Sequence, residues 1–150
     1  SALMGVQRRF EFHLKNENIV YIDDYAHHPE ELKAAIKSIK ALYPDKKLTA
    51  IFQPHLYSRT RDFADEFAKS LSLADDIILL DIYPAREEPI EGVSSQIILD
   101  KITSPKKRLT VKSELLDLIS KEHPEIVVTF GAGDIDRMVP HIKEILSKNI

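Results

Sequence analysis

The chain has 150 residues, of which 43% are hydrophobic and 30% are charged, a balance typical of a folded globular protein that excludes an intrinsically disordered one. Its formal net charge of −3 argues against nucleic acid as a partner, because binding the phosphate backbone usually requires a basic excess. The absence of cysteine excludes a disulfide scaffold, a thiolate nucleophile and a cysteine-ligated metal.

Short apolar runs alternate with amphipathic helical patterns along the chain. Residues 9–14 and 18–23 flank a turn and predict a β-hairpin. Further strands are predicted at 48–53, 76–82, 108–111 and 126–130, and helices at 31–42, 62–71, 94–102, 113–121 and 134–146. Ser113 is a candidate helix cap, and Pro140 predicts a kink or break in the last helix. Strands alternating with helices indicate an α/β domain with a mostly parallel sheet, to which the hairpin adds one antiparallel strand.

The ends of the chain suggest a piece of a longer protein. The longest aliphatic run, Ile77 to Leu80, is far too short to span a membrane, and the N-terminus has neither the basic start nor the apolar core of a signal peptide. Position 1 is Ser rather than Met. We expect residues 1–4 to be a cloning remnant or a linker, and residues 5–150 to form one domain.

Polar residues gather in four loops that follow predicted strands. These loops begin near Asp24, Pro54, Tyr83 and Gly131. Ligands bind beyond the carboxyl ends of strands in open parallel sheets, so we expect the loops to meet at one edge. That edge would hold paired carboxylates, three histidines, several arginines and a Gly-rich turn.

Each group also has a structural interpretation. Asp23 or Asp24 could close the strand and cap the following helix. Two carboxylates and two histidines suggest a metal site. However, adjacent His27 and His28 cannot point the same way from an extended chain, so we expect no metal here. Arg59 suits a carboxylate or phosphate but could equally be a solvated charge.

The remaining rim features are weaker signals. Residues 131–134 could be a simple turn capped by Asp134 or an anion-binding nest, and Asp81 could be structural or lie at the rim. The sequence contains no phosphate-binding loop and no dinucleotide fingerprint. The rim therefore resembles half of a site that another domain completes.

Five strings resemble the C-terminal domain of the Mur ligases of peptidoglycan synthesis, in the branch that adds L-alanine. They are GVQRRF at 5–10, DDYAHHP at 23–29, FQPHLYSRTRD at 52–62, DIYPA at 81–85 and GAGDI at 131–135. The resemblance implies a Rossmann-like three-layer domain that closes over ATP and the incoming amino acid. It implies N-terminal and central domains as partners, the central one holding most of the ATP and Mg²⁺. It also implies a bacterial cytoplasmic enzyme whose isolated C-terminal domain is inactive.

The family reaction implies roles for individual residues. ATP phosphorylates the carboxylate of UDP-N-acetylmuramate, and the amino group of L-alanine attacks the acyl phosphate. The resemblance implies that Arg9 stabilises the ATP phosphates and that Asp24 holds the nucleotide. The residues implied to bind the amino acid are Tyr25, His27, His28, His55 and Arg59. One departure is Leu56, where some members carry arginine; the residues after Asp24 fit the alanine-adding branch, since other Mur ligases have a lysine there.

Three alternatives remain open. The murein peptide ligase that recycles tripeptide has a similar segment to residues 23–29, although residues 52–60 favour the alanine-adding branch. A phosphoacceptor receiver domain also has an early acidic pair, but residues 126–130 are not followed by the lysine that such modules need. The third is a stand-alone nucleotide-binding module. A phosphate loop encoded upstream would favour the ligase.

Overall fold

The computed structural model describes residues 9–148, which contain six strands. Their bounds are β1 Glu11–Lys15, β2 Val20–Asp24, β3 Leu48–Phe52, β4 Asp76–Leu79, β5 Lys106–Leu109 and β6 Ile126–Phe130. They form a single sheet in the order β1-β2-β6-β3-β4-β5. Strand β1 pairs antiparallel with β2, and every other neighbouring pair is parallel. The predicted α/β class with one antiparallel edge strand is confirmed.

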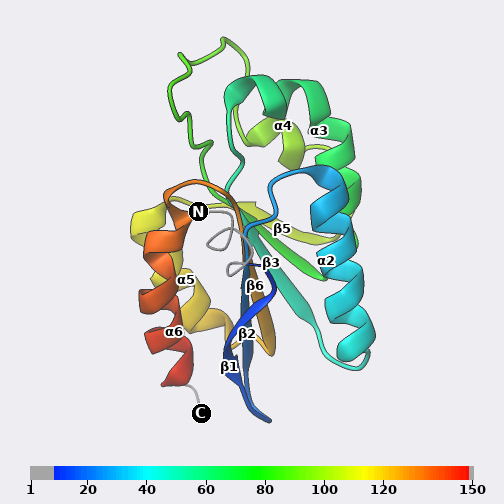
Figure 1. Ribbon diagram of the computed structural model, residues 1–150, viewed down its shortest axis with the longest axis vertical. Helices are drawn as coiled ribbons and strands as arrows, with labels where there is room; N and C mark the ends of the chain where they lie inside the picture. Colours follow the sequence, from blue (N-terminus) through cyan, green and yellow to red (C-terminus); the bar gives the residue numbers. More distant parts are fainter. Residues whose placement is uncertain (1–8, 149–150) are drawn as a thin grey trace.

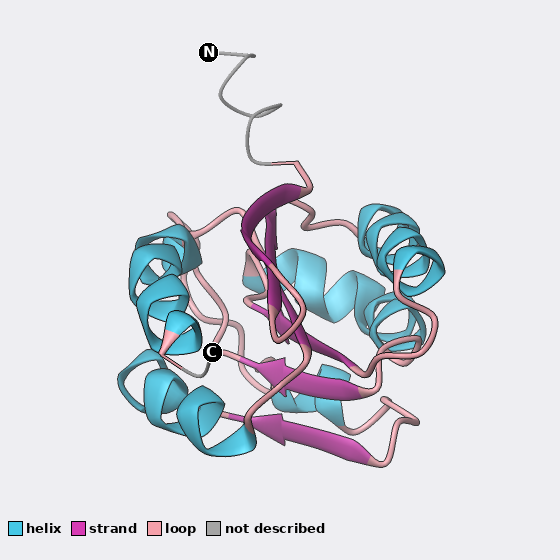
Figure 2. Ribbon diagram, turned by 90° about the horizontal axis from the view of Figure 1, so that it is seen from below, coloured by secondary structure: helices cyan, strands magenta, loops and turns pink. Residues whose placement is uncertain are grey.

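Helices cover both faces of this sheet and give the three layers (Figure 1, Figure 2). Their bounds are α2 Pro29–Leu42, α3 Tyr57–Leu71, α4 Gln96–Leu99, α5 Lys112–Glu122 and α6 Val139–Ser147, with a short 3₁₀ helix, η1, at Asp134–Met138. Helices α2, α3 and α4 pack on one face, and α5, η1 and α6 pack on the other.

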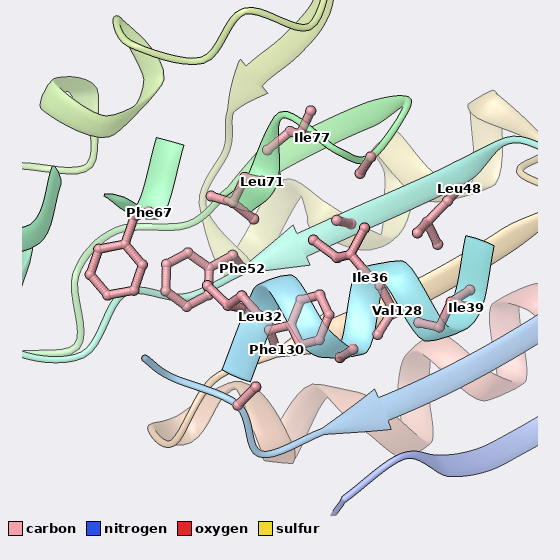
Figure 3. Close-up of a cluster of buried hydrophobic side chains, with 14 of the residues drawn as sticks. Leu32, Ile36, Ile39, Leu48, Phe52, Phe67, Leu71, Ile77, Val128 and Phe130 are labelled. Carbon is pink, nitrogen blue, oxygen red and sulfur yellow. The ribbon is translucent and has the colours of Figure 1, made fainter. Parts of the chain in front are cut away.

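Two apolar clusters hold the layers together. Successive strand residues point to opposite faces, so Val20 and Ile22 join the cluster under α2 and α3 while Tyr21 joins the cluster under α5 and α6. Figure 3 shows the first cluster, where Leu32, Ile36 and Ile39 of α2 lie against the central strands. Strands β3 and β6 are buried along their whole length, which accounts for their continuous apolar sequences.

The N-terminal hairpin forms as predicted. The Asn16 Oδ1 atom accepts hydrogen bonds from the backbone amides of Asn18 and Ile19, at 2.8 and 3.0 Å, and so closes the turn between β1 and β2. Residues 1–8, which include the expected cloning remnant and the start of the GVQRRF string, lie outside the described residues.

Some predicted boundaries were wrong. Helix α3 begins at Tyr57 rather than residue 62, and β4 ends at Leu79, which leaves Asp81 beyond the strand and exposed at the rim. Ser113 does not cap α5, because that helix begins one residue earlier. The predicted break in the last helix is confirmed, but it lies just before Pro140 rather than at it. The 3₁₀ helix η1 ends at Met138, and Pro140 lies in the first turn of α6.

The described residues also bear on membrane association. No helix within residues 9–148 combines the length and the apolar character that a bilayer span requires.

Candidate functional site

The loops after β2, β3, β4 and β6 meet at the carboxyl edge of the sheet, as predicted. The ring of His27 lies 6.0 Å from that of His55, which in turn stacks on Tyr83 with centroids 5.7 Å apart. The Gln53 side-chain amide donates to Asp134 Oδ1 at 2.7 Å and so links the loops after β3 and β6. We refer to this edge, formed by the residues of these four loops, as the rim.

Asp24 ends β2 with its side chain almost fully buried. Its Oδ1 atom accepts the amide of Ala26 at 2.8 Å, and its Oδ2 atom accepts the amide of Phe10 at 3.0 Å. Burial raises the pKa of Asp24, an effect that these hydrogen bonds and the Arg9 guanidinium oppose. Neither Asp24 nor Asp23 caps α2: Asp23 accepts a hydrogen bond from Thr129 Oγ1 at 2.7 Å inside the sheet.

Arg9 lies beside Asp24 at one end of the rim, and its side chain is 61% exposed. The Arg9 Nη2 atom donates to Glu31 Oε2 at 3.1 Å. A pocket of about 410 Å³ is bordered by Arg9, Asp24 and Glu31. Arg9 therefore presents an exposed guanidinium that is tethered by one solvent-accessible ion pair, an arrangement that leaves it free to bind an anion.

Glu31 organises the start of α2. Its Oε1 atom accepts the amides of both His27 and His28 at 3.1 Å, the role that a third-position glutamate has in helix capping. Burial raises the pKa of Glu31, but those two hydrogen bonds and the nearby imidazoles outweigh it, so the pKa lies below its ordinary value. The chain turns here, and the rings of His27 and His28 come within 4.5 Å of each other. The expectation that adjacent histidines cannot point the same way was therefore wrong, although His28 itself has extended backbone angles, with φ −112° and ψ 151°.

His55 and Arg59 face each other across the first turn of α3. The Arg59 Nη1 atom lies 3.3 Å from His55 Nδ1. Arginine can only donate, so Nδ1 accepts and the ring proton of neutral His55 is on Nε2. Burial, the Arg59 charge and His27 all lower the pKa of His55 from 6.5. Burial, His27 and Arg59 likewise lower the pKa of His28. These two imidazoles are therefore neutral at pH 7.

Tyr83 and Gln53 hold the loops around His55 in place. Tyr83 accepts the Leu56 amide through its carbonyl at 2.9 Å and donates its own amide to Pro54 at 2.8 Å. Gln53 is buried, and its Oε1 atom accepts the Ile135 amide at 3.0 Å. A Cβ on Gly133 would lie 2.5 Å from the Tyr83 ring and 2.6 Å from Gln53 Oε1, so this turn must carry glycine to pass between them.

A carboxylate from a later loop caps α3. Ser58 donates its backbone amide to Glu87 Oε1 at 3.1 Å and its hydroxyl to Glu87 Oε2. The helix has no side-chain cap of its own, and the residue before it, Leu56, has a positive φ of 74°. Glu87 therefore fixes the turn that carries Arg59.

The structure brings most of the sequence-predicted site residues together. The amino-acid group of Tyr25, His27, His28, His55 and Arg59 forms one cluster. Arg9 and Asp24 form a neighbouring pair that Glu31 connects to it. Arg61 is exposed and pairs with Asp62 at 2.8 Å. Asp134 does not cap η1; it accepts from Gln53 and Lys112 instead.

Four contributors were not predicted as site residues: Glu31, Gln53, Tyr83 and Glu87. Glu31 had a readable signal, since a glutamate three residues after a helix start is a capping pattern. Gln53 and Tyr83 also had a readable signal. Gln53 is the last residue of the predicted strand at 48–53, and Tyr83 directly follows the predicted strand at 76–82, so both lie where ligands bind in a parallel sheet. Glu87 had none, since its partner is 29 residues away.

A separate hollow lies away from this site. Its volume is about 690 Å³, and it is lined by Asp75, Asp76 and Lys106 at the amino ends of the strands. No residue singled out from the sequence as functional lies there.

Comparisons with known proteins point to one family. The family described as "Mur ligase, glutamate ligase domain" matches residues 8–133. The UDP-N-acetylmuramate–L-alanine ligase of Parabacteroides distasonis is 62% identical over 150 residues, which are 100% of this chain and 32% of that protein. The ligase of the same name from Flavobacterium johnsoniae is 54% identical over 100% of this chain and 33% of its own length. The chain thus spans about a third of the curated relatives it matches.

Solved structures agree on the fold. The crystal structure of UDP-N-acetylmuramate-alanine ligase from Thermotoga maritima superimposes with a TM-score of 0.75 at 28% identity, covering 95% of this chain and 30% of that one. A murein peptide ligase from Psychrobacter arcticus gives a TM-score of 0.73 at 21% identity, covering 93% and 30%. The second match concerns the fold alone.

Proposed function

The chain belongs to the Mur ligase family, and on this premise we propose that it is the C-terminal domain of the ATP-dependent ligase that joins L-alanine to UDP-N-acetylmuramate. The observation that carries the proposal is the 62% identity to a ligase of that name along the entire chain. The rim supports it, because the residues that the resemblance assigns to the amino acid lie together.

The nucleotide side of the site is formed by Arg9 and Asp24. The 410 Å³ pocket beside them leaves the Arg9 guanidinium free to approach phosphate oxygens when the domains close. Asp24 holds the Phe10 amide and thereby fixes the backbone next to Arg9. We assign to Asp24 this positioning role in addition to a contact with the nucleotide.

The amino-acid side of the site is formed by Arg59 and the histidines. Arg59 offers the forked donor group that binds a carboxylate through two parallel hydrogen bonds. His55 accepts a hydrogen bond from Arg59 through Nδ1, so its Nε2–H group is directed away from Arg59. The aromatic ring of Tyr25 packs edge-on against His27, with centroids 5.1 Å apart, and closes one wall.

The family resemblance implies the reaction. The γ-phosphoryl group of ATP passes to the muramate carboxylate, giving ADP and an acyl phosphate. The neutral amine of L-alanine attacks the acyl carbon, and the tetrahedral intermediate collapses with loss of phosphate to leave the amide. In this scheme Arg9 stabilises negative charge on the phosphates and Arg59 orients the amine by its carboxylate.

The rim of this chain does not fit Mg²⁺. That ion prefers six oxygen ligands, whereas the carboxylate oxygens of Asp24, Asp134 and Glu87 already accept hydrogen bonds from neighbouring groups of the chain. We therefore assign Mg²⁺ and most of the ATP contacts to the central domain, which together with the N-terminal domain would complete the enzyme, and we propose that the complete protein acts in the bacterial cytoplasm.

The acceptor distinguishes this proposal from the recycling ligase. With UDP-N-acetylmuramate, ATP and Mg²⁺, the complete gene product is expected to form product with L-alanine and not with L-Ala-γ-D-Glu-meso-diaminopimelate, as measured by mass spectrometry. Arg59→Lys is expected to raise the KM for alanine by about tenfold or more, because a lysine cannot form the paired hydrogen bonds. Arg61→Lys is the matched control. Product with the tripeptide alone would contradict the proposal.

A further inference from the structure

The start of α2 holds two imidazoles and a carboxylate in one place. His27, His28 and Glu31 each offer a ligand atom, and these atoms lie within 4.8 Å of one another. The two rings are 4.5 Å apart, and the Glu31 carboxylate lies beneath the turn that carries them. The three side chains are exposed or half-buried, and to form a tetrahedral site they would rotate toward one another.

The hydrogen bonds around the cluster leave suitable atoms available. His27 Nδ1 lies 3.0 Å from the carbonyl oxygen of Tyr25, which can only accept, so Nδ1 donates and Nε2 of the neutral ring keeps its lone pair. A histidine ligand is commonly oriented in this way, through its second ring nitrogen bonded to a backbone carbonyl. Glu31 uses Oε1 for the two amides, whereas its Oε2 atom pairs with the exposed Arg9 side chain.

We propose that His27, His28 and Glu31 form a binding site for a zinc-type divalent cation, with a water molecule as the remaining ligand. Two imidazoles and one carboxylate are a donor set that Zn²⁺ favours over Mg²⁺. A helix N-terminus disfavours a cation, so the negative charge of Glu31 is essential to the site. The cation replaces Arg9 at Oε2, while Oε1 continues to cap α2.

The site is tested by titrating the full 150-residue chain, without substrates, with Zn²⁺ in a calorimeter and with Co²⁺ in an absorption spectrometer. About one ion is expected per chain, with the intense visible bands of four-coordinate Co²⁺, and Mg²⁺ in excess is not expected to compete. His27→Gln, His28→Gln and Glu31→Gln are each expected to weaken Zn²⁺ binding by about tenfold or more.

Two variants keep the test specific. Glu31→Gln retains an oxygen that can accept from the two amides, so α2 stays capped while the charge is lost. His141→Gln removes an exposed histidine of α6 and is expected to leave Zn²⁺ binding unchanged. Thermal melting of each variant verifies folding. Absence of binding, or equal affinity in all four variants, would overturn the site. Neither result bears on the ligase assignment, because no substrate is present.

Discussion

At the scale of single residues, Asp24 and Arg9 differ in what they do for the fold. Asp24 is buried and satisfies two backbone amides, whereas Arg9 is exposed and makes one ion pair with Glu31. A buried donor left without an acceptor costs about 1–3 kcal/mol, while an exposed ion pair contributes about 0–1 kcal/mol. Substitution therefore separates a structural role from a catalytic one.

We expect Asp24→Ala to lower the free energy of unfolding by about 2–4 kcal/mol, because the amides of Phe10 and Ala26 lose their acceptor. Arg9→Ala is expected to change it by less than about 0.5 kcal/mol. Urea denaturation measures both.

In the complete ligase, both variants are expected to lower turnover by about 100-fold or more. Normal turnover with Arg9→Ala would refute its role at the phosphates.

The lowered pKa of His55 makes stability depend on pH. Between its ordinary value of 6.5 and its lower value in the folded state, the unfolded chain binds a proton that the native chain does not. The free energy of unfolding is therefore expected to fall as the pH drops below 6.5. This contribution of His55 stops changing once the imidazole is protonated in the native state as well.

His55→Gln is expected to reduce this pH dependence, as measured by urea denaturation at pH 7.5 and 5.5. His141→Gln serves as the control, because no shift of His28 or His55 depends on it. An undiminished difference between the two pH values in His55→Gln would show that other groups cause it.

At the scale of elements, the site depends on turns that are held from a distance. The β6–η1 turn passes between Tyr83 and Gln53, and Tyr83 stacks on His55. A side chain at Gly133 would push the Tyr83 ring away and so disturb His55.

We expect Gly133→Ala to lower the free energy of unfolding by about 1–3 kcal/mol, the usual cost of an added methyl group in a packed site. It is also expected to raise the KM for alanine in the complete ligase. Adding Tyr83→Ala to it is expected to restore neither the stability, because Gln53 Oε1 at 2.6 Å and the Cβ of residue 83 at 2.8 Å still obstruct the new methyl group, nor the KM, because His55 loses its stacking partner. Unchanged stability in Gly133→Ala would contradict the packing described for this turn.

Local patterns predicted the elements whose causes are local. The alternating hairpin and the apolar runs of β3 and β6 follow from residues that are close in sequence. The start of α3 was placed five residues too late because its cap, Glu87, comes from a loop 29 residues further on. The pairing of His27 with His28 was also missed, since it depends on how Glu31 turns the chain.

The family resemblance and the topology predicted the site to different extents. The carboxyl edge of a parallel sheet was enough to place His27, His55 and the loop after β6 together. The specific roles of Arg9 and Asp24 came from the resemblance and stay predictions. Which atoms are free, such as Nε2 of His27, depends on hydrogen bonds that no sequence pattern encodes.

At the scale of the whole molecule, the rim belongs to a chain that is much shorter than its relatives. The chain spans 32% of its Parabacteroides relative, and it contains no phosphate-binding loop of its own. Its core, however, is complete on both sheet faces within the described residues.

We therefore expect the 150-residue chain to unfold in one cooperative transition yet to release no ADP from ATP with UDP-N-acetylmuramate and L-alanine. Thermal melting by circular dichroism and a coupled ADP assay measure the two properties. Turnover by this chain alone would show that the rim is a complete active site rather than part of one.

The most direct test of the central claim is ADP release by the complete gene product with UDP-N-acetylmuramate, ATP, Mg²⁺ and L-alanine, each omitted in turn. Our account predicts sustained ADP release when all four are present and none when any one is missing. Release that does not need L-alanine, or no release with the full set, would contradict the assignment of this chain to an alanine-adding ligase.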